Sequence, residues 1–152
     1  MQVTMPKTIL FFCTANYYRS RYSELLFNHY AGECGLNWRA DSRGILASQH
    51  NNPGPIYSVV TDRLEYLGIR TGNDHRYPLQ MAEKDLEKAD LTIALKQAEH
   101  FEMMKQLFPD WAERITYWHI HDIDVEPPEI ALPKIDIEIL KLVRTLGCDQ
   151  PK

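Results

Sequence analysis

Apolar residues recur along this chain with two alternating spacings. Short continuous apolar runs, typical of buried strands, alternate with stretches in which apolar side chains return every three or four residues, as on one face of a helix. Residues 8–12 form the first run, and the stretch behind it carries Tyr22, Leu26 and Tyr30 on a single helix face. The pattern predicts strands at 7–13, 36–42, 90–95 and 115–121, and helices at 19–32, 55–67, 82–88, 97–108 and 133–146.

Strands that alternate with helices predict an α/β fold, in which a parallel sheet carries helices on both faces. The four predicted strands give a four-stranded sheet in a three-layer α/β/α arrangement. The chain has 152 residues, of which 44% are hydrophobic and 25% charged, an ordinary globular composition large enough for one core. No repeat or low-complexity stretch divides the sequence, so residues 1–152 are predicted to form a single domain.

Charge and hydropathy argue against several classes of partner. A net charge of −4 disfavours nucleic-acid binding, which normally needs a basic surface. No apolar run in the sequence approaches the roughly 20 residues that span a bilayer, and the N-terminus lacks the apolar core of a signal peptide. Three cysteines without a metal-binding spacing are typical of the reducing cytoplasm. We therefore expect a cytoplasmic protein in which Cys34 and Cys148 are incidental.

One segment carries specific chemistry. A predicted strand runs directly into Cys13, and Arg19 and Ser20 follow where the next helix opens. Such a loop lies at the carboxyl end of a strand, and its backbone N–H groups, with the helix dipole and the guanidinium, bind a tetrahedral oxyanion and favour a thiolate. The alternative is a buried structural cysteine beside a surface arginine. The glycine-lysine pair of nucleotide-binding loops is missing, which disfavours nucleoside triphosphates.

Residues 13–21 read Cys-Thr-Ala-Asn-Tyr-Tyr-Arg-Ser-Arg and resemble the Cys-x-Gly-Asn-x-Cys-Arg-Ser-Pro loop of the low-molecular-weight protein tyrosine phosphatases. Further similarities follow in the family's order at 41–44, 75–76, 89–95 and 118–122. The resemblance implies the strand order 2-1-3-4, with the Cys13 loop at the point where the connections reverse direction. It also implies a phosphatase that acts on phosphate monoesters, phosphotyrosine among them, and needs no cofactor.

Each residue of the loop then has an expected role. Cys13 is the nucleophile that forms a phosphocysteine intermediate, and Arg19 holds the phosphoryl oxygens in the transition state. Ser20 hydrogen-bonds the sulfur or caps the helix. Asp122, after the fourth predicted strand, is the expected general acid, with Asp124 as the alternative. The other residues expected to bind the phosphoryl group are Thr14, Ala15, Asn16, Tyr17 and Tyr18.

Polar residues outside the loop complete the expected site. The resemblance implies that Ser42 and His75 join Asn16 in a supporting network, although each also fits an ordinary surface residue. His119 and His121 alternate on one strand face and suit a cation, but no third ligand has a convincing spacing, so no metal is expected.

Four positions depart from the family's pattern. Arg21 replaces a proline, and it either adds positive charge close to the mouth of the pocket or is a solvated residue on the helix surface. Ala15 replaces a glycine and would strain the loop if its φ had to be positive. Tyr18 replaces the second cysteine, so no disulfide can form within the loop. Ile123 replaces the proline after the acid, which would leave Asp122 less firmly held.

Three functions fit these residues. The first is a phosphatase that acts on a phosphorylated protein or a small phosphate ester; phosphotyrosine and phosphoarginine both fit the pocket. The second is a module of the same fold that binds an oxyanion without turnover. The third is an arsenate reductase, which is disfavoured because no cysteine lies between Cys34 and Cys148 to relay a disulfide.

Overall fold

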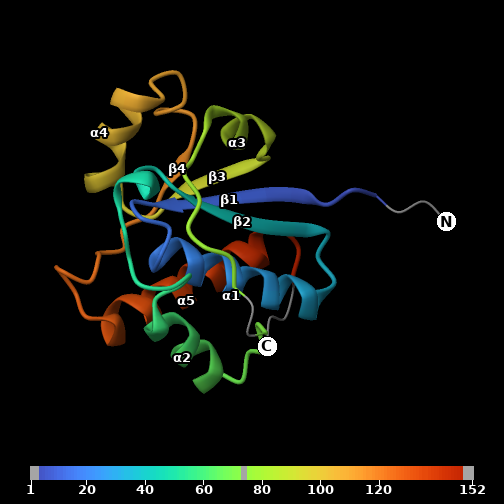
Figure 1. The fold of residues 1–152 in the computed structure, drawn as a ribbon. Helices are drawn as coiled ribbons and strands as arrows, with labels where there is room; N and C mark the ends of the chain where they lie inside the picture. The colour runs from blue at the N-terminus through green and yellow to red at the C-terminus, as the bar shows by residue number, and fades with distance from the viewer. Residues whose placement is uncertain (1–3, 73–74, 149–152) are drawn as a thin grey trace.

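The computed structural model describes residues 4–72 and 75–148, and a parallel four-stranded sheet forms its centre (Figure 1). The strands are β1 (Lys7–Cys13), β2 (Trp38–Gly44), β3 (Leu91–Ala94) and β4 (Thr116–Tyr117), in the order β2-β1-β3-β4. The α/β class and the strand order expected from the sequence are both confirmed.

Helices cover both faces of the sheet, as the alternating pattern predicted. On one face lie α1 (Arg19–Cys34), α2 (Ser58–Tyr66) and α5 (Pro128–Thr145), and on the other lie α3 (Glu83–Lys88) and α4 (Gln97–Leu107) (Figure 1). A short 3-10 helix, Ala47–Gln49, follows β2. Among the described residues, no helix combines the length and the hydropathy that crossing a membrane requires.

The alternation of side chains along β1 divides its residues between two hydrophobic cores. Ile9, Phe11 and Cys13 belong to the larger core, which packs under α1, α2 and α5. Leu10 and Phe12 belong to the smaller core on the side of α3 and α4. All five are buried because β1 is a central strand with neighbours on both sides. The register therefore brings Cys13 to the face on which α1 begins.

The carboxyl end of β1 is the place where the chain connections diverge. One connection, through α1, leads to β2 on one side of β1, whereas α4 leads from β3 to β4 on the other side. Open α/β sheets bind ligands in the crevice at such a point. The topology therefore puts the Cys13 loop where the resemblance implied.

Two elements, β4 and α5, have an end more than three residues away from the prediction. β4 covers two residues only, instead of 115–121. α5 begins at Pro128, five residues before the predicted start, and Pro133 lies inside it. Pro133 cannot donate a helical hydrogen bond, but its neighbours Ala131 and Leu132 are buried in the larger core, and this burial offsets the missing bond.

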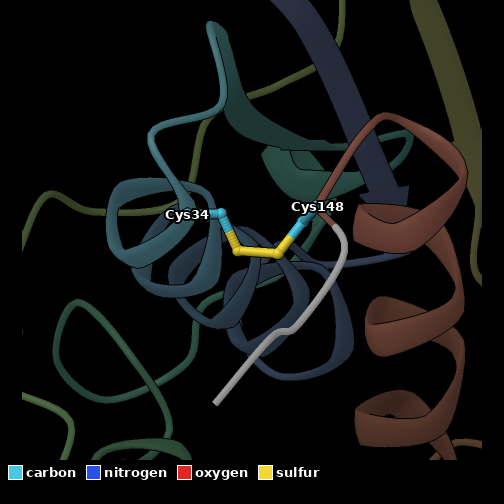
Figure 2. The surroundings of a disulfide bond; sticks show 2 residues. All are labelled: Cys34 and Cys148. Carbon is cyan, nitrogen blue, oxygen red and sulfur yellow. A yellow bond between two sulfur atoms is a disulfide. The ribbon is translucent and has the colours of Figure 1, made fainter.

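A disulfide joins Cys34, the last residue of α1, to Cys148, which follows α5 (Figure 2). The prediction that both cysteines are incidental is therefore wrong. They are 114 residues apart in sequence, so no local spacing indicates the pair, and the packing of α1 against α5 brings their Cα atoms to 5.7 Å. Because disulfides persist mainly in oxidising compartments, the cysteine pattern no longer supports a reducing cytoplasm.

Candidate active site

A cavity of about 680 Å³ opens at the Cys13 loop, at the carboxyl end of β1. Its other walls come from residues 50–57, from the first turns of α4 and from residues 122–124 after β4. Asn16, within the loop, and Ser20, which follows it, do not line the cavity and are fully buried. The residues predicted for the site that line the cavity are Cys13, Thr14, Ala15, Tyr17, Tyr18, Arg19 and Asp122.

Cys13 is a free, buried thiol at the N-terminal end of α1. Its Sγ lies 3.0 Å from the hydroxyl of Ser20, in the first turn of the helix. α1 has no side-chain cap and no acidic residue in this turn, so its first N–H groups and its dipole remain available for an anion beside the sulfur.

Asn16 gives the loop its shape. Its φ of 56° is left-handed, and it is the one non-glycine residue with positive φ in the part of the chain that the structure describes. Asparagine tolerates this conformation better than most residues. Ala15 needs no positive φ, so the strain anticipated there does not arise. The tight approach is at Gly44 instead, where an added Cβ would come within 2.8 Å of backbone atoms of Ala15 and Asn16.

The Asn16 side chain is the centre of a directed hydrogen-bond network. Its Oδ1 accepts from the Arg76 guanidinium at 2.9 Å and from a backbone N–H at 3.1 Å, which fixes the orientation of the amide. Its Nδ2 therefore donates to the hydroxyl oxygens of Ser20, at 2.8 Å, and Ser42, at 2.9 Å. Because Ser20 accepts from the amide, its own proton is available for the Cys13 sulfur.

Ser42 continues this network by donating to the Glu24 carboxylate at 2.5 Å. Burial raises the pKa of Glu24 against the opposing effects of Ser42, Arg21 and Arg76. Arg21, where the family has proline, is 2% exposed and donates to the Arg76 carbonyl at 3.0 Å. It is therefore an internal residue that helps to hold Arg76 in place, and the expectation of a solvated arginine on the helix surface is wrong.

His75 was predicted to take part in the same network. Its Nε2 lies 3.5 Å from the Thr71 hydroxyl, and the contact with Asn16 comes from the next residue, Arg76. The long arginine side chain also donates to the Ser42 carbonyl at 2.8 Å. A role of His75 in the network stays a prediction. Arg76, the second residue of the pair at 75–76 that resembles the family's pattern, contacts Asn16, which the sequence analysis did not predict.

Sequence reasoning also missed Glu99, which contacts both Arg19 and the loop. Its carboxylate accepts from Nη2 of Arg19 at 2.9 Å and from Nη1 at 3.4 Å, and the Thr14 hydroxyl donates to it as well. The Ile120 carbonyl accepts from Nη1 at 3.0 Å. Glu99 lies in the first turn of α4, just beyond the carboxyl end of β3. That position beside the loop is the signal that could have identified it.

His100 holds the Glu99 carboxylate in place. The Lys96 N–H donates to Nδ1 of His100 at 3.1 Å, so the neutral ring carries its proton on Nε2, 3.0 Å from Glu99. Burial lowers the pKa of His100 more than Glu99 raises it. Burial acts to raise the pKa of Glu99, but the hydrogen bonds from His100, Arg19 and Thr14 outweigh this effect. The pKa of Glu99 therefore lies well below its usual value, and the carboxyl is ionised.

Asp122 lines the cavity with its Oδ2 3.5 Å from Nη2 of Arg19. Its Oδ1 accepts from the Ile123 N–H at 2.9 Å. Its backbone carbonyl accepts from the N–H groups of Val125 and Glu126, and these bonds close a turn. This turn holds Asp122 in the absence of the family's proline. Asp124 lines the same cavity, so both candidates for the acid are present at its wall.

Tyr17 and Tyr57 form an aromatic wall of the cavity. Their rings stack with centroids 5.7 Å apart, and the Tyr17 hydroxyl donates to the Pro53 carbonyl at 2.5 Å. Tyr18 packs edge-on against Tyr57, and its buried hydroxyl has no hydrogen-bond partner among the described residues. Burial, with a contribution from the charge of Asp122, raises the pKa of Tyr18 far above its usual value, so the phenol is neutral.

Comparisons with solved structures agree with this architecture. A low molecular weight protein tyrosine phosphatase from T. tengcongensis is 27% identical, with a TM-score of 0.77 over 91% of this chain and 99% of that one. The arginine phosphatase YwlE from Geobacillus stearothermophilus is 22% identical, with a TM-score of 0.74 over 95% and 96% of the two chains. Wzb from Vibrio vulnificus, in complex with benzylphosphonate, is 18% identical, with a TM-score of 0.76 over 91% and 98%.

A search of curated protein sequences gave no significant match. The family model described as low molecular weight phosphotyrosine protein phosphatase, however, matches residues 8–138. This range includes the Cys13 loop, the Asn16 network, Glu99 and Asp122, and it covers most of the chain. The protein therefore belongs to the low molecular weight phosphotyrosine protein phosphatase family, whose fold and cysteine loop it carries.

Proposed function

We propose that this protein hydrolyses phosphate monoesters through a phosphocysteine intermediate, with aryl esters such as phosphotyrosine as its substrate class. The observation that carries the proposal is the free thiol of Cys13, held by Ser20 at the uncapped end of α1 and in the same cavity as the buried guanidinium of Arg19. A nucleophile, an oxyanion site and a fixed positive charge therefore meet at one place.

In the first step the Cys13 sulfur attacks phosphorus, and the bond between phosphorus and the ester oxygen breaks. The backbone N–H groups of residues 14–19 and the Arg19 guanidinium take the charge that develops on the equatorial oxygens. Asp122 donates a proton to the leaving oxygen. Its position at the cavity wall beside Nη2 of Arg19 supports this role.

In the second step a water oxygen attacks phosphorus, and the bond between phosphorus and the Cys13 sulfur breaks. Asp122, now ionised, takes a proton from that water, which returns the acid to its starting form. Inorganic phosphate and the thiolate are released. Ser20, whose proton is directed at the sulfur, stabilises the thiolate as it leaves.

The stacked rings of Tyr17 and Tyr57 support an aryl ester as substrate. They give the cavity one flat aromatic wall, fixed by the hydrogen bond from Tyr17 to Pro53. A phenyl ring that stacks there gains buried apolar area and an aromatic contact. The phosphoryl group would then reach the Cys13 loop beside the wall.

The charges in the cavity support a second candidate, the hydrolysis of phosphoarginine. Glu99, Asp122 and Asp124 line the cavity with Arg19 as the one Lys or Arg among the lining residues. Carboxylates at the wall favour a leaving group that becomes cationic, such as guanidinium. The YwlE arginine phosphatase from Geobacillus stearothermophilus shares the fold at 22% identity. Parallel assays with a phosphotyrosine peptide and a phosphoarginine peptide of the same sequence separate the two candidates.

Hydrolysis of para-nitrophenyl phosphate under reducing conditions tests the proposal. We expect turnover by the wild type and none by Cys13→Ser, which keeps the loop and removes the nucleophile. Turnover by Cys13→Ser at the wild-type rate would exclude the covalent mechanism. Binding of vanadate by both proteins, with turnover by neither, would identify an oxyanion-binding module instead of an enzyme.

The identity of the acid is tested with two leaving groups. Phenolate is more basic than nitrophenolate, so phenyl phosphate depends more strongly on proton donation. Asp122→Ala should lower kcat for phenyl phosphate by roughly 100-fold or more, and kcat for para-nitrophenyl phosphate by less. Asp124→Ala is the matched control, and a larger loss in that variant would transfer the role to Asp124.

A further inference from the structure

The Arg19 guanidinium has five N–H protons in a fixed planar fork, and the structure shows where three of them go. The two on Nη1 are donated to the Ile120 carbonyl at 3.0 Å and to Glu99 at 3.4 Å. One on Nη2 is donated to Glu99 at 2.9 Å. The remaining protons, on Nε and Nη2, lie side by side on the other edge of the fork.

This second edge lacks a strong acceptor. Nε of Arg19 is buried and has no hydrogen-bond partner within the described part of the chain. The Asp122 carboxylate is 3.5 Å from Nη2, too long for a strong hydrogen bond. Two adjacent donors on a buried cation match two oxygens of a tetrahedral oxyanion. Leaving them unsatisfied is costly, so this edge is suited to a ligand.

We propose that Glu99 is a positioning residue for this active site. By binding the Nη1–Nη2 edge of Arg19, it directs the Nε–Nη2 edge to the phosphoryl group. Through its hydrogen bond with Thr14 it also ties the start of the loop to Arg19 at its end. The inference rests on the proposed phosphatase function and names a residue on which that function depends.

The surroundings of Glu99 fit this role. Its carboxylate is fixed by Nε2 of His100, which is itself oriented by the Lys96 N–H, so the chain of contacts begins at the backbone of the β3–α4 connection. An ionised carboxylate beside the anion site repels a phosphate dianion. Glu99 therefore favours catalysis through the geometry of Arg19 and disfavours binding through its charge.

These opposed effects predict a split between kcat and affinity in Glu99→Gln. The amide keeps the length of the side chain but has only one acceptor oxygen, so it cannot offer a separate oxygen to each of Nη1 and Nη2. We expect kcat for para-nitrophenyl phosphate to fall roughly 10- to 100-fold, because small misplacement of a catalytic group has costs of this order. The inhibition constant of inorganic phosphate should stay equal or become smaller, because a repelling charge is gone.

Glu102→Gln is the matched control, since it removes the same charge from an exposed position on the same helix. It should leave kcat and the phosphate inhibition constant unchanged. A kcat within twofold of wild type in Glu99→Gln would overturn the inference. Weaker phosphate binding that accounts for the whole loss of kcat/KM would overturn it too. A melting curve of each variant shows that the proteins compared are folded.

A second measurement does not depend on turnover. The ¹⁵N–¹H signal of the Arg19 Nε group, assigned by its loss in Arg19→Lys, should move when inorganic phosphate is added to the wild type. In Glu99→Gln the signal should be broadened or shifted before phosphate is added. Phosphate binding that leaves the wild-type signal in place would overturn the inference. A shifted signal in a protein without turnover would refute the phosphatase function and retain the role of Glu99.

Discussion

The sulfur of Cys13 and the hydroxyl oxygen of Ser20 lie 3.0 Å apart, and Asn16 sets the direction of the hydrogen bond between them. The Asn16 amide donates to Ser20, so the hydroxyl proton is left for the sulfur. A donor of this kind stabilises a thiolate. Its effect should therefore be largest in the step in which the phosphorus–sulfur bond breaks.

Ser20→Ala removes this donor and should slow hydrolysis of the phosphoenzyme more than its formation. A hydrogen bond to a charged group is worth about 1.5–3 kcal/mol, which corresponds to a loss of roughly 10- to 100-fold in that step. Stopped-flow assays with para-nitrophenyl phosphate should show a rapid burst of nitrophenol followed by a slow steady state.

The control is Ser23→Ala, on the same helix, whose hydroxyl donates to the Arg19 carbonyl and leaves the sulfur network intact. No burst is expected from it beyond that of the wild type. If Ser20→Ala instead slowed the burst itself and left the steady state limited by the first step, the inference that Ser20 stabilises the leaving thiolate would be wrong.

Asn16 combines a left-handed backbone with a structural amide, and two substitutions separate these roles. Asn16→Ala loses both, whereas Asn16→Gly loses only the amide, because glycine accepts positive φ without cost. Asn16→Ala should therefore be less stable than Asn16→Gly by about 1 kcal/mol in urea denaturation. Both should lose activity to a similar degree, and equal stability of the two variants would contradict the backbone argument.

Local patterns in the sequence predicted much of this architecture. The buried run before Cys13 and the periodic positions after it predicted β1 and α1, and the loop between them predicted the oxyanion site. β1 was predicted with its observed bounds because both its faces are buried and its end is marked by the change of period. The strand order came from family resemblance, since periodicity does not say which strands are neighbours.

Local patterns could not predict contacts between segments that are distant in the sequence. Glu99 and Arg76 reach the loop from 80 and 60 residues away, and their role depends on side-chain direction. Cys34 and Cys148 pair only because α1 packs against α5. β4 was predicted too long because its apolar residues pack against the sheet without extending its ladder. Each of these features depends on tertiary packing, which the local patterns of a single sequence do not show.

Gly44 and Gly32 offer a matched pair of alanine substitutions. A Cβ on Gly44 would lie 2.8 Å from backbone atoms of the Cys13 loop, which cannot yield as a flexible side chain would. Gly44→Ala should cost about 1–3 kcal/mol of stability and weaken vanadate binding, since the loop must move. Gly32, inside α1, has no atom within 4 Å of an added Cβ, so Gly32→Ala should stabilise by about 0.5–1 kcal/mol. A neutral Gly44→Ala would show that the loop shifts freely.

The disulfide between Cys34 and Cys148 should stabilise the fold without affecting the chemistry. It closes a loop of 114 residues, and removal of a native disulfide of this kind costs about 2–5 kcal/mol. The double variant Cys34→Ala, Cys148→Ala should lose this amount in urea denaturation, and dithiothreitol should destabilise the wild type but not the variant. Cys13 is at the opposite end of α1, whose 16 residues span about 24 Å, so kcat should not change while the protein is folded.

Thiol titration of the unfolded, unreduced wild type checks independently that Cys34 and Cys148 form a disulfide. One reactive thiol, lost in Cys13→Ser, is expected, because Cys13 is the free cysteine. Three thiols would show that the bond does not form under those conditions, and the stability of the double variant should then match that of the wild type. A fall in kcat of the folded double variant would instead show that the position of Arg19, at the start of α1, depends on the anchoring of its far end.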